Sequence, residues 1–148
     1  MGTVLLLASG AGFARDKEDS KGGVGEVDAA WIKAVKSGDV EAAVKCYGKN
    51  AVLWIGGMPQ ATGEAEIRAA YQNWFNTTTI TAVSLRQLGQ HTHGDDSVGW
   101  GTYSMTTQAK SGGKPVTVTG RYSEAARGDH GHWVYVMDHA DDDPAPKK

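Results

Sequence analysis

The sequence predicts an α+β domain in which three N-terminal helices pack on a strongly curved, mainly antiparallel sheet. Apolar residues first recur at helical spacing in three segments, near 27–37, 39–47 and 63–76. Four long segments of strand character follow, at about 79–92, 97–109, 114–126 and 132–140. Short Gly- and Asp-rich turns separate these segments, which makes neighbouring strands antiparallel. Helices first and a meander of strands afterwards is typical of α+β folds, and such a sheet can enclose a cone-shaped cavity beneath the helices.

Cap and turn residues set the limits of the helices. The first helical stripe stops at Gly38, a residue type that often ends helices. Asp39 can cap a second helix, whose apolar stripe runs to Tyr47. A short β-rich run over 51–55 comes next, and the third helix begins near Gly63.

The length and composition exclude several classes of protein. With 148 residues, of which 40% are hydrophobic and 22% charged, the chain is one ordinary globular domain. The formal net charge is −2 and Lys and Arg are scattered, which argues against nucleic acid as a partner. Cys46 is the only cysteine, so no intrachain disulfide can form, and its apolar neighbours predict a small buried hydrophobe.

The N-terminal segment is apolar and rich in small residues. Residues 3–14 are too few to span a bilayer, and residues 12–14 resemble the end of a signal peptide. No Lys or Arg precedes the apolar run, so a disordered tail or a misassigned start is the alternative. We expect a signal-like segment and flexible leader over 1–25, a folded domain over 26–141 and a disordered tail over 142–148. The expected location is periplasmic or secreted, and otherwise cytoplasmic.

An ordered set of short motifs runs through the expected domain. Its pieces include Trp31-x-x-Ala34, Gly38-Asp39-Val40, Gly63-x-x-x-Ile67, Arg121-Tyr122-Ser123 and Gly131-x-Trp133-x-Tyr135-Val136-x-Asp138-His139. In this set the chain resembles the SnoaL-like branch of the nuclear transport factor 2-like superfamily. It is also similar to the association domain of calcium/calmodulin-dependent kinase II. The resemblance implies a cone-shaped, cystatin-like fold.

The resemblance implies a fold more than an activity. Related domains include steroid isomerases, polyketide cyclases, dehydratases, transport factors, oligomerisation modules and simple binding proteins, and the fold alone does not choose among them. Several of those enzymes carry an acidic base after the second helix, where this chain has Lys49-Asn50-Ala51. That difference weakens an isomerase assignment.

Aromatic residues are more numerous than the core of such a domain needs, so we expect a pocket with Tyr hydroxyls as polar groups. The helical stripes and one face of the last strand must converge on the same interior. The expected pocket residues are Trp31, Tyr47, Trp54, Tyr71, Trp74, Tyr103, Trp133, Tyr135, Met137 and His139. Arg121, on the preceding strand, either anchors an anionic ligand through a bidentate contact or lies in solvent.

His139 is the candidate catalytic residue. Strict alternation along the last strand places His139 on the inner face with Trp133 and Tyr135, and Asp138 on the opposite face. Only a β-bulge would bring Asp138 and His139 to the same pocket. A His in this position could act as a general base near neutral pH. The other interpretation is a hydrogen-bonded His that closes the sheet.

Two His-x-His pairs could bind a transition metal. These pairs are His91-x-His93 and His130-x-His132, which fall at the same end of the predicted meander. Because no Cys or arranged carboxylate accompanies them, we interpret them as surface or turn histidines. We therefore expect neither a metal nor a cofactor.

The middle strands indicate how the two faces of the sheet are used. Ser97, Gly99, Gly101 and Tyr103 share one face, where small residues would let a helix or a ligand approach closely. Trp100 then lies on the outer face. An outward Trp in mid-sheet predicts a homodimer interface.

We expect a domain that binds a small apolar or amphipathic molecule in the cone and need not be catalytic. One alternative is a lyase, isomerase or cyclase that uses His139 as general base. Another is an oligomerisation or interaction module. An enzyme needs His139 and a second polar group inside the cavity. A binder needs only volume and aromatic walls, and a module can have its cone filled by side chains.

Overall fold

Three helices and six strands form the domain in a computed structural model, which describes residues 22–145. The predicted signal-like segment over 3–14 lies outside the described residues, as do residues 146–148. The elements are α1 (Val24–Ser37), α2 (Val40–Val44), β1 (Tyr47–Ile55), β2 (Ala61–Thr62), α3 (Gly63–Thr77), β3 (Thr78–His93), β4 (Asp96–Ala109), β5 (Val116–Asp129) and β6 (His132–Asp142).

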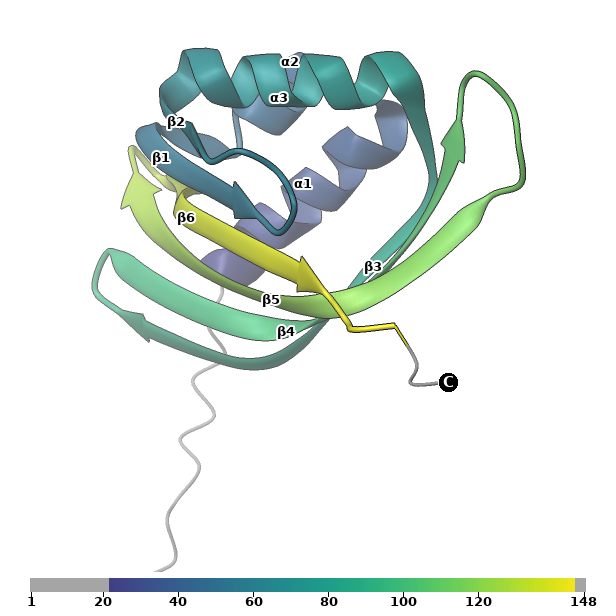
Figure 1. The fold of residues 1–148 in the computed structure, drawn as a ribbon. Coiled ribbons are helices and arrows are strands. Elements are labelled where there is room, and N and C mark those ends of the chain that lie inside the picture. Colours follow the sequence, from purple (N-terminus) through teal and green to yellow (C-terminus); the bar gives the residue numbers. More distant parts are fainter. Residues whose placement is uncertain (1–21, 146–148) are drawn as a thin grey trace, which may run out of the picture.

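All six strands belong to one sheet with the order β2-β1-β6-β5-β4-β3. Only the β1–β6 pair is parallel; the other neighbours are antiparallel. Figure 1 shows the sheet bending around α1, with α3 lying across the open side of the curve. The predicted class, three helices on a curved and mainly antiparallel sheet, is confirmed.

The helix limits differ from the prediction in two places. Helix α1 ends at Gly38 as expected, with a φ of 65°, but it begins at Val24, inside the predicted leader. The Val24 backbone N–H donates to the Ser97 hydroxyl at 3.2 Å, and this contact fixes the start of the helix. Helix α2 stops at Val44, so the expectation that its stripe extends to Tyr47 is wrong. Tyr47 instead begins β1, because it pairs with Tyr135 of β6.

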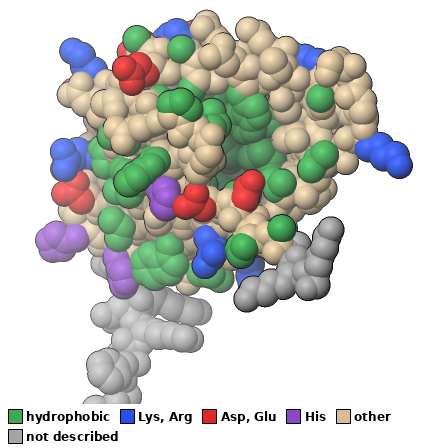
Figure 2. Space-filling view, viewed as in Figure 1, with side chains coloured by type: hydrophobic (Ala, Val, Ile, Leu, Met, Phe, Trp, Pro, Cys, Tyr) green, Lys and Arg blue, Asp and Glu red, His purple; other side chains and the backbone are tan. Residues whose placement is uncertain are grey.

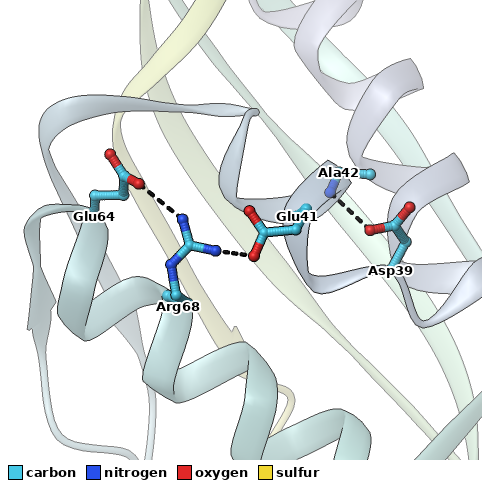
Figure 3. Close-up of polar contacts among 5 residues, drawn as sticks. All are labelled: Asp39, Glu41, Ala42, Glu64 and Arg68. Atoms are coloured by element: carbon cyan, nitrogen blue, oxygen red, sulfur yellow. Dashed lines mark hydrogen bonds and ion pairs between the residues drawn. The ribbon is translucent and has the colours of Figure 1, made fainter.

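Side-chain contacts hold α2 in place (Figure 3). The Asp39 carboxylate accepts a hydrogen bond from the Ala42 N–H at 2.9 Å and caps the helix as predicted. Arg68 of α3 bridges Glu64, at 2.7 Å, and Glu41 of α2. A short helix forms poorly by itself, so these contacts and its buried residues Ala43 and Val44 determine its position.

Helix α1 packs closely on the inner face of β4. A Cβ atom added at Gly99 would lie 2.4 Å from Val24 Cγ2, which only a glycine avoids. Ser97 is buried on the same face and bonds the start of the helix. The expectation that small residues of this strand let a helix approach is confirmed.

The C-terminal end of the chain is part of the sheet for longer than expected. Strand β6 continues to Asp142, and the Asp143 N–H donates to the Thr119 carbonyl at 2.8 Å. Residues 142 and 143 therefore belong to the fold rather than to a tail. Within residues 22–145, none of the helices is long and apolar enough to cross a membrane.

Because α1 lies so close to β4, we expect the stability of the domain to be sensitive to any side chain added at Gly99. Gly99→Ala should lower the free energy of unfolding by about 1–3 kcal/mol, because the new methyl group must displace Val24 or the helix. Urea denaturation measures this change. The matched control is Gly48→Ala, also in a strand, where the new Cβ would meet its nearest atom at 3.4 Å. Equal losses in the two variants would contradict the proposed close packing.

Candidate functional site

A cavity of about 310 Å³ lies between the concave face of the sheet and helices α1 and α3. Figure 2 shows its opening as a hollow lined by hydrophobic side chains, with acidic side chains along the lower rim. Most of the wall is apolar, with Leu53, Leu85, Met105 and Trp74 among its members. The carboxyl groups of Glu124, Asp138 and Asp142 also line it. A largely apolar cavity with a few polar groups is the usual form of a small-molecule site.

A β-bulge in β6 brings Asp138 into this cavity. Ala126 of β5 pairs with Tyr135, whereas the preceding Ala125 pairs with Met137, so Val136 has no partner of its own. The extra residue reverses the alternation of the strand after Tyr135. Asp138 is consequently 9% exposed and faces inward, so the expectation that it faces outward is wrong.

Asp138 ends a hydrogen-bonded chain that crosses the core. The Trp31 indole N–H donates to the Tyr71 hydroxyl at 2.6 Å, and the Tyr71 and Tyr47 hydroxyls are 2.7 Å apart. The Tyr47 hydroxyl donates to Asp138 Oδ2 at 2.6 Å. Each phenol has one hydrogen atom and Tyr47 gives its own to the carboxylate, so Tyr71 must be the donor to Tyr47.

Burial and the hydrogen-bonded chain shift the pKa of Asp138 in opposite directions. Burial raises the pKa of Asp138 to about 6, although the Tyr47 hydrogen bond favours the carboxylate. Within residues 22–145 only Tyr47 donates to this carboxyl group, and it binds Oδ2. Oδ1 is therefore left for a ligand or a proton. A carboxyl group with a pKa near 6 in an apolar cavity is suited to accept a proton at neutral pH.

A second acidic group lies next to the first. Glu124 of β5 pairs directly with Asp138 of β6, which places both side chains on the inner face. Asp28 of α1 accepts a hydrogen bond from the Tyr135 hydroxyl at 2.6 Å. Burial and the neighbouring Asp28 carboxyl raise the pKa of Glu124 to about 10. Burial raises the pKa of Asp28 as well, but the Tyr135 hydrogen bond opposes this and favours the Asp28 carboxylate, so the proton of this pair is assigned to Glu124.

Two buried polar atoms of the cavity wall have no partner. Within the described residues, neither Glu124 Oε1 nor the Tyr122 hydroxyl makes a hydrogen bond. Glu124 is 4% exposed, and Tyr122 is similarly buried. Both side chains line the cavity, so a bound molecule is the natural partner for these atoms.

Comparison with known proteins gives the family. The model of the SnoaL-like domain matches residues 29–136, most of the described chain. The chain belongs to the SnoaL-like domain family. No curated protein matches the chain at the level of sequence. The predicted resemblance to the SnoaL-like branch is thereby confirmed.

Solved structures share the fold of this SnoaL-like domain. A ketosteroid isomerase-like protein from Erwinia carotovora atroseptica has a TM-score of 0.72 at 19% identity, over 80% of this chain and 92% of that one. A candidate calcium/calmodulin-dependent protein kinase II association domain from Xanthomonas campestris has a TM-score of 0.65 at 21% identity, over 82% and 86%. A candidate dehydratase of the nuclear transport factor 2-like family from Streptomyces avermitilis has a TM-score of 0.65 at 18% identity, over 82% and 94%. These similarities, and others to proteins with a cystatin-like fold, confirm the predicted architecture.

The structure brings only part of the predicted pocket together in the SnoaL-like domain. The predicted residues that line the cavity are Trp31, Tyr71, Trp74, Tyr103 and Tyr135. Tyr47 is buried behind them and bonds to Asp138. Trp133, Met137, Trp54 and His139 do not line the cavity. Trp133 lies against Gly22 at the start of α1, and Trp54 is 56% exposed.

His139 lies on the outer face of the sheet, contrary to the expected inward orientation. Its ring packs against Trp54, with 5.5 Å between ring centroids, and its Nε2 lies 3.1 Å from a carboxylate oxygen of Asp141. The bulge at Val136 is the reason, because it exchanges the faces of Asp138 and His139. Arg121 is exposed and forms an ion pair with Asp143, outside the cavity.

The remaining titratable residues of interest are separate from the cavity. No cluster of three or more His, Cys, Asp or Glu side chains in residues 22–145 is arranged to hold a metal ion. Of the two His-x-His pairs, His91 packs on Trp100, and His130 contacts Asp129. Cys46 is buried as predicted, and burial raises the pKa of its thiol to about 11.

Asp28, Glu124 and Tyr122 belong to the site but are not among the pocket residues predicted from the sequence. A signal for Asp28 exists, since it lies four residues after Val24 and three before Trp31, on the apolar stripe of α1. Glu124 follows Tyr122 by two residues and so shares its inward face on β5. A charged residue in line with an apolar stripe was the available indication of a buried acid.

The raised pKa of Glu124 predicts how stability depends on pH. Above about pH 4.5 the unfolded chain loses the Glu124 proton whereas the folded protein keeps it, so stability falls as the pH rises towards 10. The loss is as much as about 1.4 kcal/mol per pH unit from this group. In Glu124→Gln the fall of the free energy of unfolding per pH unit should decrease by that amount. Urea denaturation between about pH 5 and 8 measures it. Glu26→Gln, at an exposed position of α1, is the control and should keep the native slope. Equal slopes in Glu124→Gln and the native protein would contradict a protonated Glu124.

Proposed function

We propose that this SnoaL-like domain binds a small, largely apolar molecule in the cavity and transfers a proton on it, with Asp138 as general base. The observation that carries the proposal is the position of Asp138. Its carboxyl group is buried in the cavity wall, held by Tyr47 on one oxygen and open on the other. A reaction of the lyase or isomerase class begins with such a proton abstraction from carbon.

The surroundings of Asp138 favour this role over a purely structural one. A structural buried carboxylate is usually paired with a cation or with several donors. Here one phenol, Tyr47, donates, and its partner Tyr71, which is itself bonded to Trp31, holds it in a fixed direction. Strongly perturbed carboxyl groups in a cavity are typical of acid–base sites.

The relatives support the class of reaction without naming the substrate. Two of the similar structures are described as a ketosteroid isomerase-like protein and a candidate dehydratase. The similarity to a candidate association domain favours the oligomerisation alternative instead. The open cavity argues against a module whose cone is filled by side chains. A binder without catalysis is the remaining alternative, and a test of proton abstraction distinguishes it from an enzyme.

The predicted homodimer and export also remain proposals. Val98 and Trp100 alternate with inward glycines on β4, and Trp100 is 41% exposed on the outer face. We propose that this face pairs with a second copy of the chain, which sedimentation would show as a dimer. We also keep the proposal that the protein is exported, which N-terminal sequencing of the mature protein would test.

An activated carbon acid tests the general base without knowledge of the natural substrate. In nitrobenzisoxazole a base removes the ring C–H proton, the N–O bond breaks, and a cyano-nitrophenolate is released. We expect turnover above the buffer rate that rises with pH as Asp138 ionises, with a midpoint near its pKa of about 6. Asp138→Asn should reduce the rate by about 10²-fold or more. Absorbance of the phenolate measures the reaction.

Two controls separate the interpretations. Asp95→Asn, in the exposed β3–β4 turn, should retain the native rate. A loss in His139→Ala without a loss in Asp138→Asn would overturn the assignment and favour the histidine as base. Binding of nitrobenzisoxazole with no acceleration over buffer would favour the non-catalytic binder.

A further inference from the structure

The cavity wall carries acidic groups without any basic counterpart. Glu124, Asp138 and Asp142 line it, and no Lys, Arg or His is among the described side chains that do so. Asp28 lies behind Tyr135 and adds a fourth carboxyl group. Figure 2 shows acidic side chains at the mouth of the hollow as well. Since the walls are apolar and weakly screening, the interior has a negative potential.

The pairing of Glu124 with Asp138 concentrates this effect at one point. Two acids directly opposite each other on neighbouring strands destabilise a sheet unless a proton or a cation lies between them. Without a ligand, the proton held by Glu124 removes the repulsion between the two carboxyl groups. Its Oε1 nevertheless stays buried and unpartnered, and so does the hydroxyl of Tyr122, two residues earlier on the same face. A buried polar group without a partner destabilises the protein, and a ligand that supplies the partner removes this cost.

The helices contribute aromatic side chains to the cavity wall. Trp31 and Tyr71 are fixed by their mutual hydrogen bond, and Trp74 packs beside Tyr71 with 6.1 Å between ring centroids. The faces of such rings attract cations. A cavity that carries both aromatic side chains and a pair of acids is therefore suited to a positively charged group on an apolar body.

We propose that the cavity takes an organic cation, a protonated amine on a small apolar body, whose ammonium group binds between Glu124 and Asp138. The inference rests on the proposed function only in placing the ligand in this cavity. An ammonium group has three donors, and Asp138 Oδ1, Glu124 Oε1 and the Tyr122 hydroxyl are three acceptors without protein donors. An anionic ligand would be repelled, and a neutral ligand without donors would leave Glu124 Oε1 and the Tyr122 hydroxyl without partners.

Binding of a cation should also displace a proton. With an ammonium beside it, Glu124 no longer needs its proton, which passes to solvent while the carboxylate and the ammonium form the new pair. The groups that face Glu124 are Asp28, Asp138, Tyr122 and Tyr135, so none of them can supply the compensating charge. Charge in the cavity is thus conserved across the exchange.

Three probes with one common body test the inference. Adamantyl ammonium, adamantanol and adamantane carboxylate differ only in the charged or polar group. Isothermal titration calorimetry near neutral pH should show the ammonium binding about tenfold or more tightly than the alcohol, and the carboxylate most weakly. In buffers of different ionisation enthalpy, the ammonium alone should show proton release.

Variants identify the groups responsible. Glu124→Gln should bring the ammonium and alcohol affinities to within about threefold and abolish proton release, while adamantanol still binds. Glu26→Gln, a matched loss of a carboxyl group on the exposed side of α1, should keep the preference.

The outcomes separate this inference from the proposed function. Equal affinity for the ammonium and the alcohol, or tightest binding of the carboxylate, would overturn the cation site. Failure of all three probes to bind at about millimolar concentration would overturn it too. In each case the reaction of nitrobenzisoxazole, which carries no cation, still decides whether Asp138 acts as a base.

Discussion

The extra residue in β6 is the constraint on which the site depends. Without the bulge at Val136, Tyr135 and Asp138 would lie on opposite faces of the sheet. With it, Tyr135 can reach Asp28 of α1 and Asp138 can accept the hydroxyl of Tyr47. Strand β1 has a matching irregularity, since its pairing with β6 shifts between Tyr47 and Val52. The parallel β1–β6 pair is therefore deformed where the polar groups enter the core.

The buried acids have an energetic consequence for the whole domain. Carboxyl groups are rarely buried without a cation, because desolvation disfavours their charged form. Here the fold tolerates Asp28, Glu124 and Asp138 through a proton held by Glu124 and two phenol donors. Apolar packing of the helices on the sheet must offset the remaining free-energy cost of burying these carboxyl groups. Such local cost in a cavity is typical of sites that are organised for a ligand rather than for stability.

Most of the architecture could be predicted from the sequence, because helical and alternating patterns are local. The end of α2 could not, since Tyr47 continues the helical stripe and only its pairing with Tyr135 places it in a strand. The faces of β6 could be predicted up to Tyr135 and not beyond it. A bulge depends on the register with neighbouring strands, and the sequence of β6 alone does not indicate where the extra residue lies. Regular alternation therefore predicts His139 rather than Asp138 in the cavity, and the bulge reverses the two.

The direction of the hydrogen-bonded chain connects the fold to the state of the base. Trp31 can only donate, and an ionised Asp138 can only accept, so the hydroxyls of Tyr71 and Tyr47 between them must both point towards the carboxylate. These four residues come from α1, α3, β1 and β6. When Asp138 takes up a proton, it can donate to Tyr47, and the Tyr47 hydroxyl can then donate to Tyr71 once the Tyr71 hydrogen turns away. Protonation of Asp138 thus changes the hydrogen-bond directions of residues in the core of the domain. The packing of these four elements is therefore part of the proton-accepting site.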